Sequence, residues 1–82
     1  MQVSFNPFRR VVRFQFQEEA VGGFRLNIYT QTGSLVYHYE KKGFVDKGFR
    51  YAFDAKFLAP GVYCYEIQFD DRICTSKLIK LE

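Results

Sequence analysis

Apolar and polar residues alternate along most of this chain, which is the pattern of β-strands that bury one face. No stretch shows the spacing of an amphipathic helix. The apolar positions expected to face a core are, strand by strand, Val12, Phe14 and Phe16; Phe24, Leu26 and Ile28; Leu35, Tyr37 and Tyr39; Phe49, Tyr51 and Phe53; and Tyr63, Tyr65, Ile67 and Phe69. After a turn at Asp70-Asp71, a last strand is expected over Ile73 to Leu81.

Glycine and proline separate these segments. The sequence TQTG places Gly33 where a hairpin turn needs a positive φ, and Pro60-Gly61 suits a tight turn before the next strand. A seventh strand is expected around Phe44-Val45 or near the N-terminus. Short antiparallel strands without βαβ units predict an all-β fold, a single immunoglobulin-like antiparallel β-sandwich of about seven strands covering residues 1–82 as one domain.

Composition and charge narrow the possible partners. The chain has 82 residues, 20% of them aromatic, so a small core can still bury large side chains. Its net charge of +3 comes from scattered basic residues, which does not indicate nucleic acid. The segment KGFRYAF partly matches an RNA-recognition signature, but Arg50 and Asp54 stand where that signature needs other residues. No apolar run approaches the roughly 20 residues of a membrane-spanning helix. We therefore expect no nucleic-acid partner and no membrane span.

Candidate catalytic and metal-binding residues are few. His38 is the one histidine, and it lies on the polar side of a predicted strand without a nucleophile motif around it. A two-residue turn at Asp70-Asp71 would place Cys64 opposite Lys77 and Cys74 on the other face of the hairpin, so a disulfide between the two cysteines is not expected. Their spacing fits no zinc pattern. The sequence therefore predicts a protein that is not an enzyme and binds neither metal nor cofactor.

Four motifs occur in a fixed order along the chain: NPFR from Asn6, LNIYTQTGSLVY from Leu26, FDAKFLAPGVYCYEI from Phe53, and TSKLIKL ending at Leu81. In this order and spacing they resemble the C-terminal sorting domain of the type IX secretion system, in its type A form. The resemblance covers Asn6 to Leu81. The same pattern is related to the immunoglobulin-like domain of flagellar hook-capping proteins.

The resemblance implies a non-catalytic sorting domain at the C-terminus of a longer exported protein. Such a domain directs a covalently linked N-terminal passenger through the periplasm and across the outer membrane, to the cell surface or the medium. The implied partners are the outer-membrane secretion machinery and a sortase-like peptidase. The motif residues that would carry recognition are Asn6, Pro7, Phe8, Gly33, Pro60, Gly61, Tyr63, Lys77, Leu78, Ile79 and Lys80.

Structural roles compete with recognition at these positions. Pro7 fixes its own φ and favours an extended Asn6, and Lys77 in a final strand can either keep an edge soluble or meet a receptor. The alternative function is a structural or adhesive immunoglobulin-like module of a cell-surface protein. Carbohydrate binding would need an exposed aromatic platform, for which Tyr29 and Tyr39 are candidates only if the predicted inward and outward faces of their strands are wrong.

Overall fold

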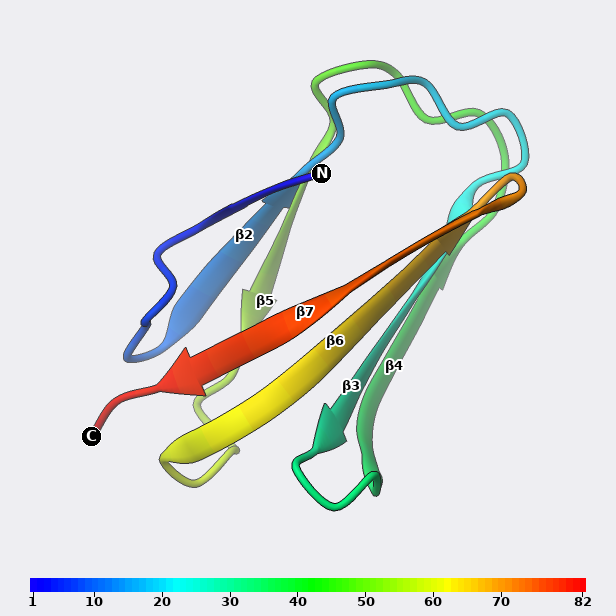
Figure 1. Ribbon diagram of the computed structural model, residues 1–82. Helices are drawn as coiled ribbons and strands as arrows, with labels where there is room; N and C mark the ends of the chain where they lie inside the picture. The colour runs from blue at the N-terminus through cyan, green and yellow to red at the C-terminus, as the bar shows by residue number, and fades with distance from the viewer.

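The computed structural model describes all 82 residues, which form seven strands and no helix (Figure 1). The strands are β1 (Gln2–Ser4), β2 (Val11–Gln15), β3 (Phe24–Thr30), β4 (Leu35–Lys41), β5 (Arg50–Asp54), β6 (Gly61–Phe69) and β7 (Arg72–Lys80). One antiparallel sheet has the order β1-β2-β5 and the other has the order β4-β3-β6-β7. The predicted all-β sandwich is confirmed. The seventh strand is the N-terminal one, whereas Val45 forms only an isolated bridge with Ala20.

Aromatic side chains join the two sheets. Phe14 of β2 and Phe16, which directly follows β2, are fully buried, and their rings reach across to the other sheet. The ring of Phe16 lies 4.8 Å from that of Phe24 and 5.3 Å from that of Phe69, and Phe14 meets Tyr65 edge-on at 5.1 Å. These are favourable geometries for aromatic pairs. They lie within one cluster of buried apolar residues that both sheets share.

The predicted inward positions are buried or half-buried with one exception, Leu35, which is 55% exposed. A β-bulge causes the difference, since Ile28 pairs with Tyr37 but the next residue, Tyr29, pairs with Leu35. The extra residue, Val36, packs against the core instead. The inward prediction for Leu35 was therefore wrong, because a bulge shifts the alternation by one residue.

The last hairpin has the predicted register. Cys64 pairs with Lys77 and Cys74 pairs with Ile67 across β6 and β7, and both cysteines are free thiols. Strand β7 has β6 as its one neighbour in the sheet and thus forms an edge. The structure contains no helix that could cross a membrane.

Candidate functional site

The four sequence motifs meet at one end of the sandwich. Gly61, at the start of β6, pairs with Lys80 near the end of β7, while Thr30 at the end of β3 pairs with Tyr63. Phe8 bridges Lys80 in parallel orientation. In Figure 1 the chain's C-terminus, the β3–β4 turn and the β5–β6 loop lie together at the lower end of the molecule. Residues from both ends of the sequence thus build one region.

The NPF motif lies along the outer edge of β7. The Asn6 side-chain amide donates to the Lys77 carbonyl at 3.0 Å, and its oxygen accepts from the Ile79 N–H at 2.9 Å. Phe8 continues the pairing, because its N–H donates to the Ile79 carbonyl at 2.9 Å and its carbonyl accepts from the Leu81 N–H at 2.7 Å. We call this set of four hydrogen bonds the seam. The side chain of Asn6 takes the place of a peptide group in a neighbouring strand.

The seam covers only half of the β7 edge. The N–H and carbonyl of Ile79 point away from β6, since they bond to Asn6 and Phe8. Backbone groups alternate in direction along a strand, so those of Lys77, Thr75 and Ile73 point outward too. No strand pairs with them there, although the Lys77 carbonyl accepts from the Asn6 side chain. The first half of β7 therefore presents an open backbone edge, which is the feature that strand addition requires.

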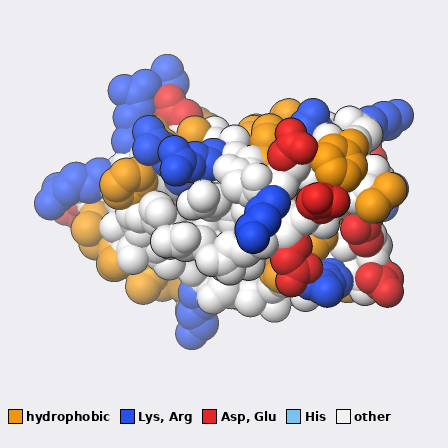
Figure 2. All heavy atoms as spheres, turned by 90° about the horizontal axis from the view of Figure 1, so that it is seen from above, with side chains coloured by type: hydrophobic (Ala, Val, Ile, Leu, Met, Phe, Trp, Pro, Cys, Tyr) orange, Lys and Arg blue, Asp and Glu red, His pale blue; other side chains and the backbone are white.

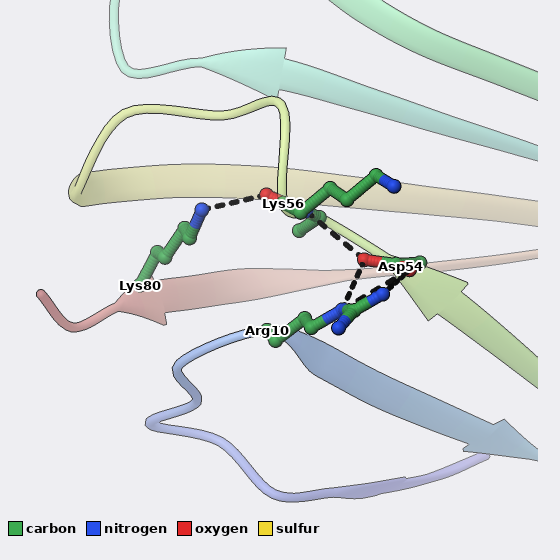
Figure 3. Close-up of polar contacts among 5 residues, drawn as sticks. Arg10, Asp54, Lys56 and Lys80 are labelled. Carbon is green, nitrogen blue, oxygen red and sulfur yellow. Dashed lines mark hydrogen bonds and ion pairs between the residues drawn. The ribbon is translucent and has the colours of Figure 1, made fainter.

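Lys80 points into the molecule rather than toward solvent. Its side chain lies on the same face of β7 as the fully buried Leu78, and Lys80 itself is only 9% exposed. The ammonium group donates to the carbonyl of Ala55 at 2.6 Å and to the carbonyl of Leu58, both in the β5–β6 loop. Figure 3 shows this side chain reaching toward the loop from the end of β7. Lys80 ties the last strand to the loop that carries Pro60 and Gly61.

A second polar contact holds the start of the same loop (Figure 3). Asp54 accepts hydrogen bonds from the Arg10 guanidinium, at 3.0 Å from Nη2, and from the backbone N–H of Lys56 at 3.1 Å. The bonds from Arg10 hold the pKa of the Asp54 carboxyl below its ordinary value, with a smaller contribution from Lys56. Sequence reasoning did not identify this pair, because no local pattern connects Arg10 with a strand end 44 residues away.

The remaining predicted site residues divide into buried and exposed groups. Tyr63 is buried, and its hydroxyl donates to the Ala59 carbonyl at 2.6 Å. Gly33 has the predicted positive φ, 94°, and its N–H closes the turn on the Thr30 carbonyl. The buried residues among those predicted are Phe8, Tyr63, Leu78 and Lys80, and the exposed ones are Asn6, Pro7, Gly33, Pro60, Gly61, Lys77 and Ile79.

The proposed aromatic platform for carbohydrate does not form as an open surface. Tyr29 and Tyr39 are both half-buried. Tyr39 packs its ring on Tyr51 at 4.4 Å between centroids, so one face of that ring is covered. Burial is the main reason why the pKa of the Tyr51 phenol is raised, followed by its hydrogen bond with Tyr37.

Charge is distributed unevenly along the molecule. In Figure 2 acidic side chains gather toward one end, and many of the lysines and arginines lie toward the other. Near the seam, Arg9 donates to the Glu82 carbonyl and Arg10 pairs with Asp54, while Lys77 is exposed. No group of three or more His, Cys, Asp and Glu side chains could hold a metal ion. The arrangement is suited to presenting a polar, partly basic surface with an open strand edge.

Comparison with known proteins identifies the family. The chain matches the family described as secretion system C-terminal sorting domain over residues 5–81. No curated protein and no solved structure matches the chain. The matched segment takes in the NPF motif and strands β2 to β7, and it begins just after β1. The chain therefore belongs to the family of C-terminal sorting domains of the type IX secretion system.

Proposed function

We propose that this chain is a non-catalytic address that delivers a covalently linked N-terminal passenger to the type IX machinery after the passenger has entered the periplasm. Membership of the sorting-domain family supports export to the cell surface or the medium. The proposed partners are the outer-membrane secretion machinery, which would bind the folded domain, and a sortase-like peptidase, which would separate domain and passenger. In this proposal residues 1–82 are one domain at the C-terminus of a longer exported protein.

The open edge of β7 is the observation that carries the proposed mechanism. An extended segment of the machinery would pair with the outward N–H and carbonyl groups of Ile73 and Thr75 and with the outward N–H of Lys77, as in other cases of strand addition. The Lys77 carbonyl already accepts from Asn6 and marks the end of the open edge. The main-chain bonds would supply affinity, and the outward side chains would supply selectivity. Lys77 is exposed there, so an acidic group on the partner could pair with it.

A proline at Thr75 tests this mechanism with little effect on the fold. The Thr75 N–H points away from β6, so Thr75→Pro removes an edge donor without removing a bond between β6 and β7. The assay fuses residues 1–82 behind a signal peptide and a fluorescent reporter, in a host with a working type IX system. We expect the unmodified fusion to reach the surface or medium and the Thr75→Pro fusion to stay in the periplasm.

Thr75→Val is the matched control, because it changes the side chain and keeps the edge donor. Thermal unfolding of both purified domains shows whether each variant is folded. Export of a folded Thr75→Pro fusion at the unmodified level would contradict recognition through this edge. Retention of the folded, unmodified fusion would contradict the sorting function itself and would leave a structural module of the cell surface.

A further inference from the structure

A basic hollow lies on the outer face of the three-stranded sheet. Its volume is about 200 Å³ and it is lined by Ser4, Phe5, Arg13, Gln15 and Arg50. The sheet register brings these residues together, since Arg13 pairs with Ser4 and Gln15 pairs with Arg50. Arg13 and Arg50 are diagonal neighbours on adjacent strands, a separation from which two long side chains can reach a common ligand.

The two guanidinium groups of this hollow have no polar partner within the protein. Three of the six arginines form ion pairs, namely Arg10, Arg25 and Arg72, and Arg9 donates to a backbone carbonyl. No carboxylate lines the hollow. Asp54 is the one carboxylate close to these arginines in the register of β2 and β5, and it already forms an ion pair with Arg10. Two like charges thus face one cavity without compensation, which favours the entry of an anion.

Phe5 adds an unusual element to the wall of the hollow. Its backbone has a φ of 70°, a conformation that is uncommon for a bulky residue. Phe5 is 58% exposed, and its ring lies beneath the Arg13 guanidinium, whose central carbon is 5.4 Å from the ring centroid. The stacked ring restricts where the guanidinium can lie. Strained residues of this kind cluster at ligand-binding sites.

We propose that this hollow binds an oxyanion, a phosphate or a carboxylate, through Arg13 and Arg50. A guanidinium presents a planar pair of N–H donors that matches such a group in a bidentate manner. The Gln15 amide and the Ser4 hydroxyl are neutral donors in the same wall. The cavity is smaller than an ordinary small-molecule pocket, so it accepts the anionic group and the part of the ligand directly attached to it. The site does not depend on the sorting function, and either proposal can fail alone.

Titration of the 15N-labelled chain by nuclear magnetic resonance tests the site. The probes are inorganic phosphate, glucose 6-phosphate and glucuronate, with glucose as a neutral control and sodium chloride at matched ionic strength. We expect saturable shifts of the Ser4, Arg13, Gln15 and Arg50 amides with the anions and none with glucose. Tighter binding of glucose 6-phosphate than of inorganic phosphate would show that the site also contacts the attached sugar. Equal affinities would show that it recognises the phosphate group alone, and both results support an oxyanion site.

Charge-matched variants separate a built site from general attraction to a positive protein. Arg13→Gln and Arg50→Gln should each weaken binding about tenfold, which corresponds to 1.4 kcal/mol. Arg25→Gln removes the same charge from the other sheet and should change the affinity less than about twofold. Equal weakening by all three variants, shifts spread over the basic residues in general, or the same shifts with chloride would overturn the proposal.

Discussion

Replacing Asn6 by alanine tests whether the seam stabilises the end of the last strand. The substitution removes the hydrogen bonds from the Asn6 amide to the Lys77 carbonyl and from the Ile79 N–H to the Asn6 oxygen. A typical intramolecular hydrogen bond contributes about 0.5–1.5 kcal/mol net. Because Asn6 is exposed and water can replace part of the lost bonding, we expect a loss of about 1–2 kcal/mol in unfolding free energy.

Thermal unfolding followed by circular dichroism measures this loss. For a domain of this size, 1 kcal/mol corresponds to roughly 4–8 °C in Tm, so Asn6→Ala should melt several degrees lower. Gln31→Ala is the control, because it truncates an exposed amide in the β3–β4 turn that makes no hydrogen bond through its side chain. Asn6→Asp should not rescue stability, since a carboxylate oxygen would face the Lys77 carbonyl.

Hydrogen exchange shows where the stability is lost. If the seam opens locally, the Ile79 amide should exchange roughly 5–30 times faster in Asn6→Ala. The Ile67 amide, in the middle of the sheet, should then change less. A Tm equal to that of Gln31→Ala, together with unchanged exchange at Ile79, would refute a stabilising role of the seam.

Three further perturbations follow from the same contacts. Lys80→Met keeps the unbranched apolar part of the side chain but removes the ammonium group and its bonds to the Ala55 and Leu58 carbonyls. Urea unfolding should therefore show a loss of about 1–2 kcal/mol. A stability at or above that of the unmodified chain would contradict the bracing role. Phe8→Ala truncates a buried ring and should lower the free energy of unfolding, by the same measurement, by about 3–5 kcal/mol. Phe8→Leu should lower it only slightly. A loss below about 1 kcal/mol in Phe8→Ala would show that Phe8 is dispensable to the core. The pKa values of Asp54 and Glu18 are lowered in the folded protein by hydrogen bonds from Arg10 and Arg72, respectively. Each carboxylate therefore adds stability above its unfolded pKa and loses it as the pH falls through the folded value. The urea midpoint should decrease below about pH 4.5, and the decrease should be smaller in Asp54→Asn combined with Glu18→Gln; an unchanged pH profile in that double variant would contradict this assignment.

Local alternation was sufficient to predict most of the fold. The inward aromatic residues of β2, β3 and β6 and the register of the last hairpin could be predicted because each depends on neighbouring residues or a short turn. Leu35 could not be placed correctly, since the bulge opposite Tyr29 is a property of the pairing between two strands. Side chains alternate between the two faces of a strand, which places Lys80 on the same face as Leu78. The inward direction of the Lys80 side chain could therefore have been predicted. Its two carbonyl partners could not, because they belong to an irregular loop.

The candidate site depends on contacts between distant parts of the sequence. Asn6 bonds to Lys77 and Ile79, 71 and 73 residues further along the chain. A sequence motif indicates that such residues matter, but it does not show whether they serve folding or recognition. The structure gives Asn6, Phe8 and Lys80 defined roles in holding β7, and it leaves the outward positions Ile73, Thr75 and Lys77 without a partner strand.

This division determines how experiments on sorting should be interpreted. Removing Lys77 to Glu82 would delete the buried Leu78, the bonds of Lys80 and the partners of Asn6 and Phe8. Loss of export after that truncation would therefore have two explanations, an unfolded domain or a missing signal. Substitutions at the outward positions avoid the ambiguity, because the buried face of β7 and its pairing with β6 stay intact. Export that depends on Thr75 or Lys77 in a folded domain would assign recognition to the edge of β7, whereas export that depends only on Asn6, Phe8 and Lys80 would mean that the machinery requires a folded domain.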